Sequence, residues 1–362
     1  MQDHDVRELR LALVMTGGVS LAVWMGGVAG EVFRCIRNEG LYGDLCDLTA
    51  TRVVVDVMSG SSAGGMNGAF LGTAIAYDLT VDEFDELRDL WLSLGSFSKL
   101  LRDPLKKDPP SLLKGDEFFG PAIENVLTSW VSRKANCVLT PSPSDLTVIL
   151  TASLLSAHLE PFADDFDTAI LEPRHRARFT FEAEHFCDGA SLPAKLALAA
   201  RTTASFPGAF EASYIPIGES GRPEADPARP DMNGIASFDR SHWAVDGGVL
   251  MNKPVKPALD AIRRRTSGGE IRRVIAYVNP DPGTPRQAID VRANPPTLGD
   301  VVMKSIITLP RAESIADHLD ELRAINQQSV DTRELRDALL RGVRVRPVGP
   351  PCLLYTSDAA DE

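Results

Sequence analysis

A Gly-x-Ser-x-Gly segment, GSSAG at residues 60–64, has the residue types of a serine nucleophile on a sharp turn. The β-branched run Arg52–Met58 before it predicts a strand, and the small residues after it suit a helix packed closely on a sheet. Side chains two residues before and after the serine would collide in such a turn, which explains Gly60 and Gly64. The N-terminus of the helix would favour developing negative charge. We therefore predict that Ser62 is a nucleophile; a Gly/Ser-rich turn without chemistry is the alternative.

A second glycine-rich segment, TGGVS at residues 16–20, follows the predicted strand Leu9–Met15. Paired glycines leave backbone N–H groups unhindered, so Gly17, Gly18 and Val19 are candidate donors to the oxyanion of a tetrahedral acyl intermediate. Taken alone, the segment is equally typical of a turn leading into a helix or of a phosphate-binding loop. The chain contains neither a GxGxxG nor a GxxxxGK[ST] pattern, which weakens the nucleotide-binding alternative.

An acidic residue stands at the end of a third predicted strand. Asp246 follows the strand His242–Val245 directly and is itself followed by Gly247 and Gly248. Active-site residues of α/β folds collect at the carboxyl ends of strands, so Asp246 is a candidate base and the two glycines support its turn. An ordinary Asp-Gly turn has the same pattern.

Considered together, these segments resemble the patatin-like phospholipase family. The resemblance covers about residues 9–260 and rests on TGGVSLAVWMGG, GSSAGGMNGAFLG, ARTTASFPGAF and DGGVLMNKPV, in the family's order. It implies a lipid acyl hydrolase, of phospholipase A or esterase type, that cleaves carboxylic esters through an acyl-enzyme. By the resemblance, Ser62 is the nucleophile and Asp246 its base in a Ser-Asp dyad, and the oxyanion hole lies at Gly17, Gly18 and Val19.

The resemblance also implies supporting roles. The ARTTASFPGAF block at Arg201–Phe210 would pack beside the site, and Asn252 and Pro254 would brace the Asp246 turn. One position departs from the family: many members carry Arg or Lys where this chain has Ser20, followed by glycine where it has Leu21. The missing cation keeps open a patatin-shaped lipid-binding module with weak catalysis.

A catalytic triad is another alternative. Ser62, Asp246 and His318 occur in the chain order of α/β-hydrolases. His318 lies in IADHLDEL, however, and a histidine in such a charged helical segment is typical of a solvated face. Exchanging His318 for alanine separates the triad from the dyad.

Strands that alternate with helical segments predict a three-layer αβα fold with a mainly parallel central sheet and a helical C-terminal extension. We expect a catalytic domain at 1–290, the extension at 291–351, and a tail at 352–362 that matches no preceding pattern and is excluded as non-native. The predicted strands are Leu9–Met15, Arg52–Met58, Thr147–Ala152, Phe179–Phe181, His242–Val245 and Arg273–Val278, and the predicted helices include 81–94, 192–204 and segments of 297–341.

The segment Leu11–Gly30 lacks charged residues and is long enough to span a bilayer. Five glycines within it favour a buried strand, a turn and a helix of small residues that runs to about Asn38. We therefore expect neither a signal peptide nor a transmembrane helix, and a cytoplasmic protein that is at most peripheral at a membrane.

The composition narrows the function classes. Of 362 residues, 44% are hydrophobic and 24% charged, as in globular proteins, and the net charge of −12 argues against nucleic-acid binding. The charge also disfavours anionic membranes, so we expect membrane contact to be transient and made by apolar loops near the site. The expected partner is a lipid or other ester substrate, and the oligomeric state stays open.

Cysteine and histidine usage points to no cofactor. The five cysteines are widely separated without a CxxC pair, and no two of the six histidines have HxxxH spacing. We therefore expect neither a disulfide framework nor a metal site.

Overall fold

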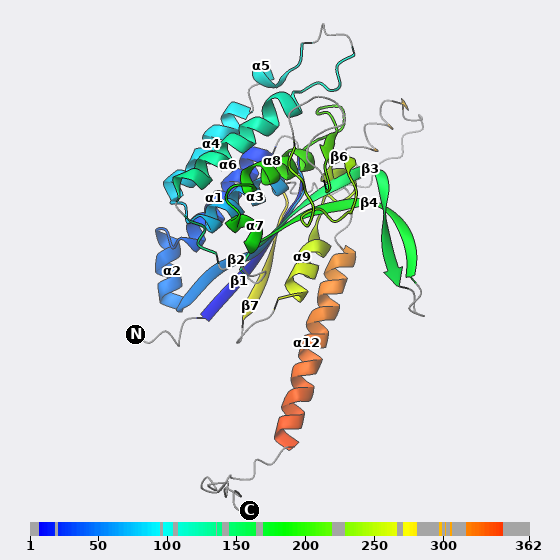
Figure 1. The fold of residues 1–362 in the computed structure, drawn as a ribbon. Coiled ribbons are helices and arrows are strands. Elements are labelled where there is room, and N and C mark those ends of the chain that lie inside the picture. The colour runs from blue at the N-terminus through cyan, green and yellow to red at the C-terminus, as the bar shows by residue number, and fades with distance from the viewer. Residues whose placement is uncertain are drawn as a thin grey trace, which may run out of the picture. The chain divides into compact units, whose positions relative to one another are not determined.

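The computed structural model shows a chain divided into two compact units, 1–313 and 314–362 (Figure 1). The second unit is described through one helix, α12 (Ala316–Gly342). The boundary predicted near residue 290 and the tail 352–362 lie outside the described residues. These comprise 7–18, 21–94, 97–103, 108–134, 136–139, 145–163, 169–218, 229–265, 271–280, 297–298, 301, 305 and 316–342.

A seven-stranded sheet forms the centre of the first unit. Its order is β5-β6-β3-β2-β1-β7, and β4 pairs with β3 beside this path. Strands β3, β2, β1 and β7 are parallel, whereas β4, β5 and β6 join antiparallel. The strands are β1 (Arg7–Met15), β2 (Thr51–Gly60), β3 (Thr147–Ala163), β4 (Ala169–Glu182), β5 (Ser213–Ile215), β6 (His242–Asp246) and β7 (Arg272–Val278).

Helices cover both faces of the sheet, so the predicted three-layer αβα architecture is confirmed. Helices α1, α3 and α8 pack on one face and α9 on the other (Figure 1). The helices of the first unit are α1 (Ala22–Ile36), α2 (Leu41–Thr49), α3 (Ala63–Ala76), α4 (Val81–Leu94), α5 (Phe97–Leu100), α6 (Gly120–Arg133), α7 (Ala183–Cys187), α8 (Leu192–Thr203) and α9 (Val255–Arg263), with a π-helical turn at Gly115–Phe119 and a 3₁₀ turn at Gly247–Val249.

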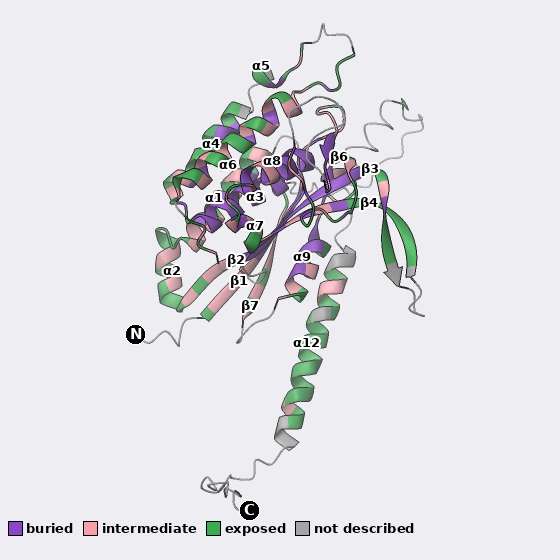
Figure 2. Cartoon of the chain, in the orientation of Figure 1, coloured by how far each residue is buried: buried purple, intermediate pink, exposed green. Residues whose placement is uncertain are grey.

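Helix α3 lies at the centre of the core, because nearly all its residues are buried (Figure 2). Its small residues let it approach the sheet closely. A Cβ added at Gly72 would lie 2.7 Å from Val148 Cγ2, closer than real Cβ contacts allow. The composition of this segment thus fixes the position of the helix that begins after Ser62.

The N-terminal apolar segment forms β1 and α1, as predicted, although α1 ends at Ile36. The predicted helix at 81–94 is also confirmed, and its start carries the reciprocal pair Thr80 N to Glu83 Oε2 (2.7 Å) and Glu83 N to Thr80 Oγ1 (3.2 Å). None of the helices in the described ranges is both long and apolar enough to cross a bilayer.

Strands β3 and β4 are much longer than predicted. The sequence indicated strands at Thr147–Ala152 and Phe179–Phe181, but both continue into a paired ribbon of 17 and 14 residues. The ribbon carries Ser, His, Glu and Pro among its apolar residues, and this mixture hides the strand pattern.

Candidate active site

Ser62 occupies a sharp turn between β2 and α3. Its backbone has φ 50° and ψ −124°, a conformation that residues with a side chain rarely adopt. A Cβ at Gly60 would lie 2.5 Å from the carbonyl carbon of Gly64, and a Cβ at Gly64 would lie 2.4 Å from the carbonyl oxygen of Met15. Both glycines are therefore required by space, as the Gly-x-Ser-x-Gly pattern predicts.

Strands β2 and β6 run toward each other along one edge of β3, because β4 occupies the other edge. On the shared edge β2 ends at Gly60, opposite Leu150, and β6 ends at Asp246, opposite Ala152. Leu150 and Ala152 are two residues apart, so the two strand ends are about 7 Å apart along β3. The fold thus brings Asp246 to the turn that carries Ser62.

The Asp246 carboxylate is almost fully buried, and its Oδ1 accepts a hydrogen bond from Gly248 N at 2.7 Å. The turn after Asp246 is pressed against β3, since a Cβ at Gly247 would lie 2.0 Å from Thr151 Oγ1. Gly247 and Gly248 therefore support the turn, and they fix the carboxylate at its strand end.

The first glycine loop faces the serine turn. A Cβ at Gly17 would lie 2.8 Å from Ser62 Cβ and 2.7 Å from Asn252 Oδ1. The Gly17 amide donates to Asn252 Oδ1 at 3.0 Å, so this N–H is engaged within the protein. That contact differs from the expectation that Gly17 is an oxyanion donor. Gly18 is buried beside it, whereas Val19 and Ser20 lie outside the described residues.

The C-terminal end of α8 contacts both halves of the site. Thr203 Oγ1 accepts from Ser62 N at 3.0 Å, and the Ser205 carbonyl accepts from Asp246 N at 2.9 Å. The 201–210 block therefore lies beside the site, and two of its residues hold the backbones of Ser62 and Asp246. Sequence reasoning did not assign these bonds, because a threonine at a helix end gives no local signal of a distant partner.

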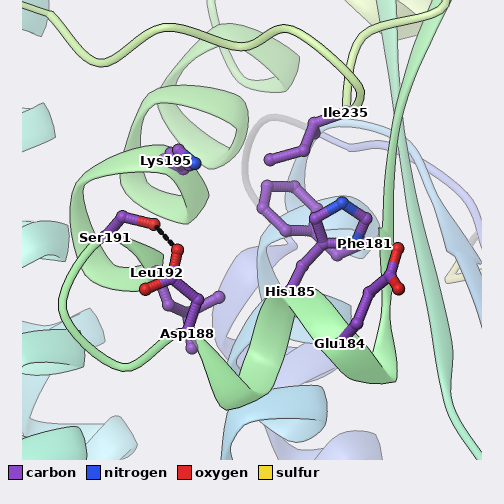
Figure 3. Close-up of a pocket in the computed structure, with 8 residues that line it drawn as sticks. All are labelled: Phe181, Glu184, His185, Asp188, Ser191, Leu192, Lys195 and Ile235. Atoms are coloured by element: carbon purple, nitrogen blue, oxygen red, sulfur yellow. Dashed lines mark hydrogen bonds between the residues drawn. The ribbon is translucent and has the colours of Figure 1, made fainter. Parts of the chain in front are cut away.

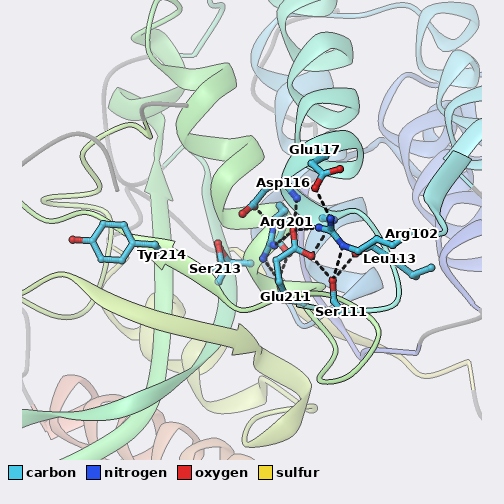
Figure 4. A network of polar contacts seen from close by, with 12 residues as sticks. Arg102, Ser111, Leu113, Asp116, Glu117, Arg201, Glu211, Ser213 and Tyr214 are labelled. Carbon is cyan, nitrogen blue, oxygen red and sulfur yellow. Dashed lines mark hydrogen bonds and ion pairs between the residues drawn. The ribbon is translucent and has the colours of Figure 1, made fainter. Parts of the chain in front are cut away.

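A buried network of charges surrounds Arg201, which lies on the last turn of α8 (Figure 4). Arg201, 2% exposed, contacts Asp116 Oδ1 at 2.9 Å and Glu211 Oε1 at 3.2 Å, and its Nη1 donates to Ser205 Oγ at 2.6 Å. Arg229 also pairs with Asp116, at 2.5 Å. The network anchors the end of α8 to segments that are far away in sequence.

Glu211 is the acidic centre of this network. Burial opposes its charged form, but hydrogen bonds from Ser111 Oγ and Asp116 N and the charge of Arg201 outweigh burial and lower its pKa to about 2. Arg102 adds a contact at 3.2 Å. Glu211 is therefore a structural anion throughout the physiological pH range.

His242 lies on the same strand as Asp246, and His318 belongs to the alternative triad. His242 begins the five-residue strand that Asp246 ends, and its ring packs edge-on against Phe238. Three residues of strand lie between them, which places their Cα atoms about 13 Å apart, so His242 does not contact the carboxylate. The side chain of His318, in the second unit, lies outside the described residues.

The described ranges contain no cluster of three or more His, Cys, Asp or Glu residues that could hold a metal ion. A separate cavity of about 150 Å³ lies beside α7 and α8 (Figure 3). Its walls include Phe181, His185, Asp188 and Lys195, and no member of the Ser62 site reaches it.

Comparison with known proteins gives two matches. A family model described as patatin-like phospholipase matches residues 13–259. The chain is also 35% identical over 370 residues to a protein of Mycobacterium tuberculosis (strain ATCC 25618 / H37Rv) named uncharacterized membrane protein Rv3479. That alignment covers 92% of this chain and 33% of the mycobacterial protein, so the chain spans about a third of its relative's length.

Proposed function

The chain belongs to the patatin-like phospholipase family, whose members are lipid acyl hydrolases, and we propose that it hydrolyses carboxylic esters of lipids on a Ser62–Asp246 dyad. One observation carries the proposal: β2 and β6 meet end to end along β3. Strand β2 ends at Gly60, two residues before Ser62, and β6 ends at Asp246. The strained turn at Ser62 supports it, because strain of this kind persists where the surrounding structure and function require it.

The proposed reaction has two steps. Ser62 Oγ attacks the ester carbonyl while the Asp246 carboxylate takes its proton, and Asp246 then returns that proton to the departing alcohol. Water hydrolyses the acyl-enzyme in the second step, with Asp246 again accepting a proton and giving it back to Ser62. We assign the oxyanion to the amides of Gly18 and Val19, since the Gly17 amide already bonds to Asn252.

Hydrolysis of a panel of esters tests this proposal. We expect turnover of phospholipids or other lipid esters and of a short p-nitrophenyl ester by the wild type, none above background for Ser62→Ala, and a kcat about 10²- to 10⁴-fold lower for Asp246→Asn. Ser59→Ala is the matched control. Ser59 lies near the end of β2, the strand that leads to Ser62, and its buried Oγ has no hydrogen-bond partner in the described part of the chain. Equal turnover by Ser62→Ala and Ser59→Ala would contradict the proposal.

A lipid-binding module with weak catalysis is a second candidate. Two observations favour it: Ser20 replaces the family's frequent cation, and the Gly17 amide is engaged by Asn252. Both reduce the groups that are left to stabilise an oxyanion. Vesicle binding by wild type and Ser62→Ala alike, without turnover of any ester in the panel, would select this candidate.

Contact with a membrane surface is part of the proposal. The substrates of the family are lipid esters, and the mycobacterial relative is named a membrane protein. The relative is about three times as long as the aligned region, so its name describes a much longer protein. The name supports membrane contact of this chain only in combination with the lipid substrates of the family. The described site would act on lipids from the surface of a bilayer.

A further inference from the structure

The ribbon of β3 and β4 extends beyond the site. Pairing of β3 with β6 ends at Leu154, after which β3 continues with β4 as a two-stranded arm to Ala163 (Figure 1). Because β3 is parallel to β2, the arm projects past the strand end that leads to Ser62. The same strand therefore supports the site and carries the arm.

One face of the arm is apolar. Leu159 pairs with Pro173, and Pro161 pairs with Leu171. Residues opposite each other in an antiparallel pair share a face, as do alternate residues of one strand, so these four side chains lie on the same face. Leu159 and Leu171 are each 59% exposed. We name these four residues the apolar ribbon face.

In the described strands of the arm, the charged residues Glu160, Glu172 and Arg174 lie on the opposite face. Arg174 pairs there with Glu160 at 3.0 Å and with Glu172 at 2.8 Å. His158, on that same face, is buried, with its ring centre 6.3 Å from that of Phe238. This opposite face is the one turned toward the segment around Phe238, so the apolar ribbon face points away from it. Among the described residues of the two strands, the apolar ribbon face carries no charged side chain.

Strand addition is a poor use for this arm. Proline has no backbone N–H and interrupts the ladder that a further strand would need. Each strand of the arm contains one proline, at 161 and 173, as edge strands protected from pairing do. Contact through side chains, for which the apolar ribbon face offers two exposed leucines, fits the arm better.

We propose that the apolar ribbon face binds the surface of a bilayer of neutral, zwitterionic lipid and brings the Ser62 site to its substrate. The choice of a lipid surface as the binding partner rests on the proposed function, since a lipid ester hydrolase must act at such a surface. The charge pattern selects the lipid: an uncharged face on a chain of net charge −12 is not repelled by zwitterionic headgroups, whereas anionic lipid would repel it. Ala152, two residues before Leu154, pairs with Asp246, so the strand that carries the arm also carries the Asp246 end of the dyad.

Vesicle binding by the full chain tests the inference independently of turnover. In a Ser62→Ala background, we measure binding to phosphatidylcholine vesicles by co-sedimentation. We expect the affinity to fall at least about tenfold when Leu159→Ser and Leu171→Ser are combined, because two leucine side chains would no longer transfer apolar surface from water into the bilayer. The matched control is Leu41→Ser with Leu48→Ser. These leucines are 78% and 83% exposed on α2, before the start of β2, and their exchange should leave binding unchanged.

The same exchanges in the active chain provide the second readout. Activity on a soluble p-nitrophenyl ester should stay within about twofold of the wild type for both double variants, since neither pair touches the described site. Only the ribbon variant should lose activity on phosphatidylcholine vesicles. If the wild type does not hydrolyse the soluble ester, the proposed function is refuted, whereas the vesicle-binding experiment still tests the role of the apolar ribbon face.

Three results would overturn the inference. One is vesicle binding by the ribbon variant that equals that of the wild type, and another is a wild type that does not bind these vesicles. The third is a dimer, seen by analytical ultracentrifugation, that the ribbon variant alone dissociates without a change in vesicle binding. That outcome would assign the face to a second copy of the chain. Melting temperatures within a few degrees of the wild type would show that the variants are folded.

Discussion

At the scale of single residues, the backbone of Ser62 is the least usual feature of the site. A positive φ at a residue with a side chain costs on the order of 1–3 kcal/mol, a cost that glycine largely avoids. We therefore expect Ser62→Gly to be more stable than Ser62→Ala by about 1 kcal/mol, while both are inactive. Urea unfolding of the two variants measures the difference. A Ser62→Gly variant that is less stable than Ser62→Ala would show that the turn is unstrained.

Gly17 is confined between the serine turn and the side chain of Asn252. A Cβ there would lie within 3 Å of Ser62 and Asn252, so Gly17→Ala should abolish esterase activity and lower the free energy of unfolding by about 1–3 kcal/mol. Gly27 is the matched control, because a Cβ at that position in α1 meets nothing within 4 Å. Gly27→Ala should keep activity and gain up to about 1 kcal/mol from better helix propensity. Similar behaviour of the two variants in activity and urea unfolding would contradict this account.

At the scale of elements, the end of α8 holds the backbone of Ser62, the proposed nucleophile, through Thr203. Thr203→Val removes the acceptor of Ser62 N and leaves a buried N–H without a partner, at about 1–3 kcal/mol. We expect kcat to fall at least about tenfold while KM changes little, because the bond positions Ser62 and does not contact substrate. Thr203→Ser keeps the hydroxyl and should restore most of the rate. Equal kinetics for the valine and serine variants would exclude this positioning role.

The charge network behind α8 predicts a pH dependence of stability. The pKa of Glu211 is lowered from about 4.5 to about 2, so the folded state binds its proton less readily than the unfolded chain. The stabilisation is complete above about pH 4.5 and disappears as pH falls toward 2; the shift corresponds to about 3 kcal/mol. Glu211→Gln should therefore be less stable than the wild type at pH 7, with a difference that narrows between pH 4.5 and 2. A difference that is constant with pH would refute the role of this charge.

Also at this scale, the sequence predicted some elements well and others poorly, for physical reasons. Ser62 and Asp246 could be placed from sequence because each follows a short β-branched or apolar strand and is bounded by glycines that tight turns require. The ribbon of β3 and β4 was missed because exposed strands with Pro, Glu and His lack a clear alternation. The contacts of Thr203, Ser205 and Arg201 could not be predicted, since they join segments whose proximity arises only when β2, β6 and α8 are assembled.

At the scale of the whole molecule, the chain consists of an α/β unit and a second unit described through α12. The proposed dyad lies entirely in the first unit, between β2 and β6. A triad would instead need His318 of the second unit. The two hypotheses therefore make opposite predictions for one substitution, His318→Ala, which leaves every described contact of Ser62 and Asp246 in place.

Covalent labelling with a fluorophosphonate, followed by mass mapping of the adduct, is the most direct test of the central claim. The account predicts an adduct on Ser62 in the wild type, none in Ser62→Ala, and markedly slower labelling of Asp246→Asn. Ser59→Ala and His318→Ala should label at the wild-type rate. An adduct on a different residue, or His318→Ala that labels as slowly as Asp246→Asn, would contradict the Ser62–Asp246 dyad.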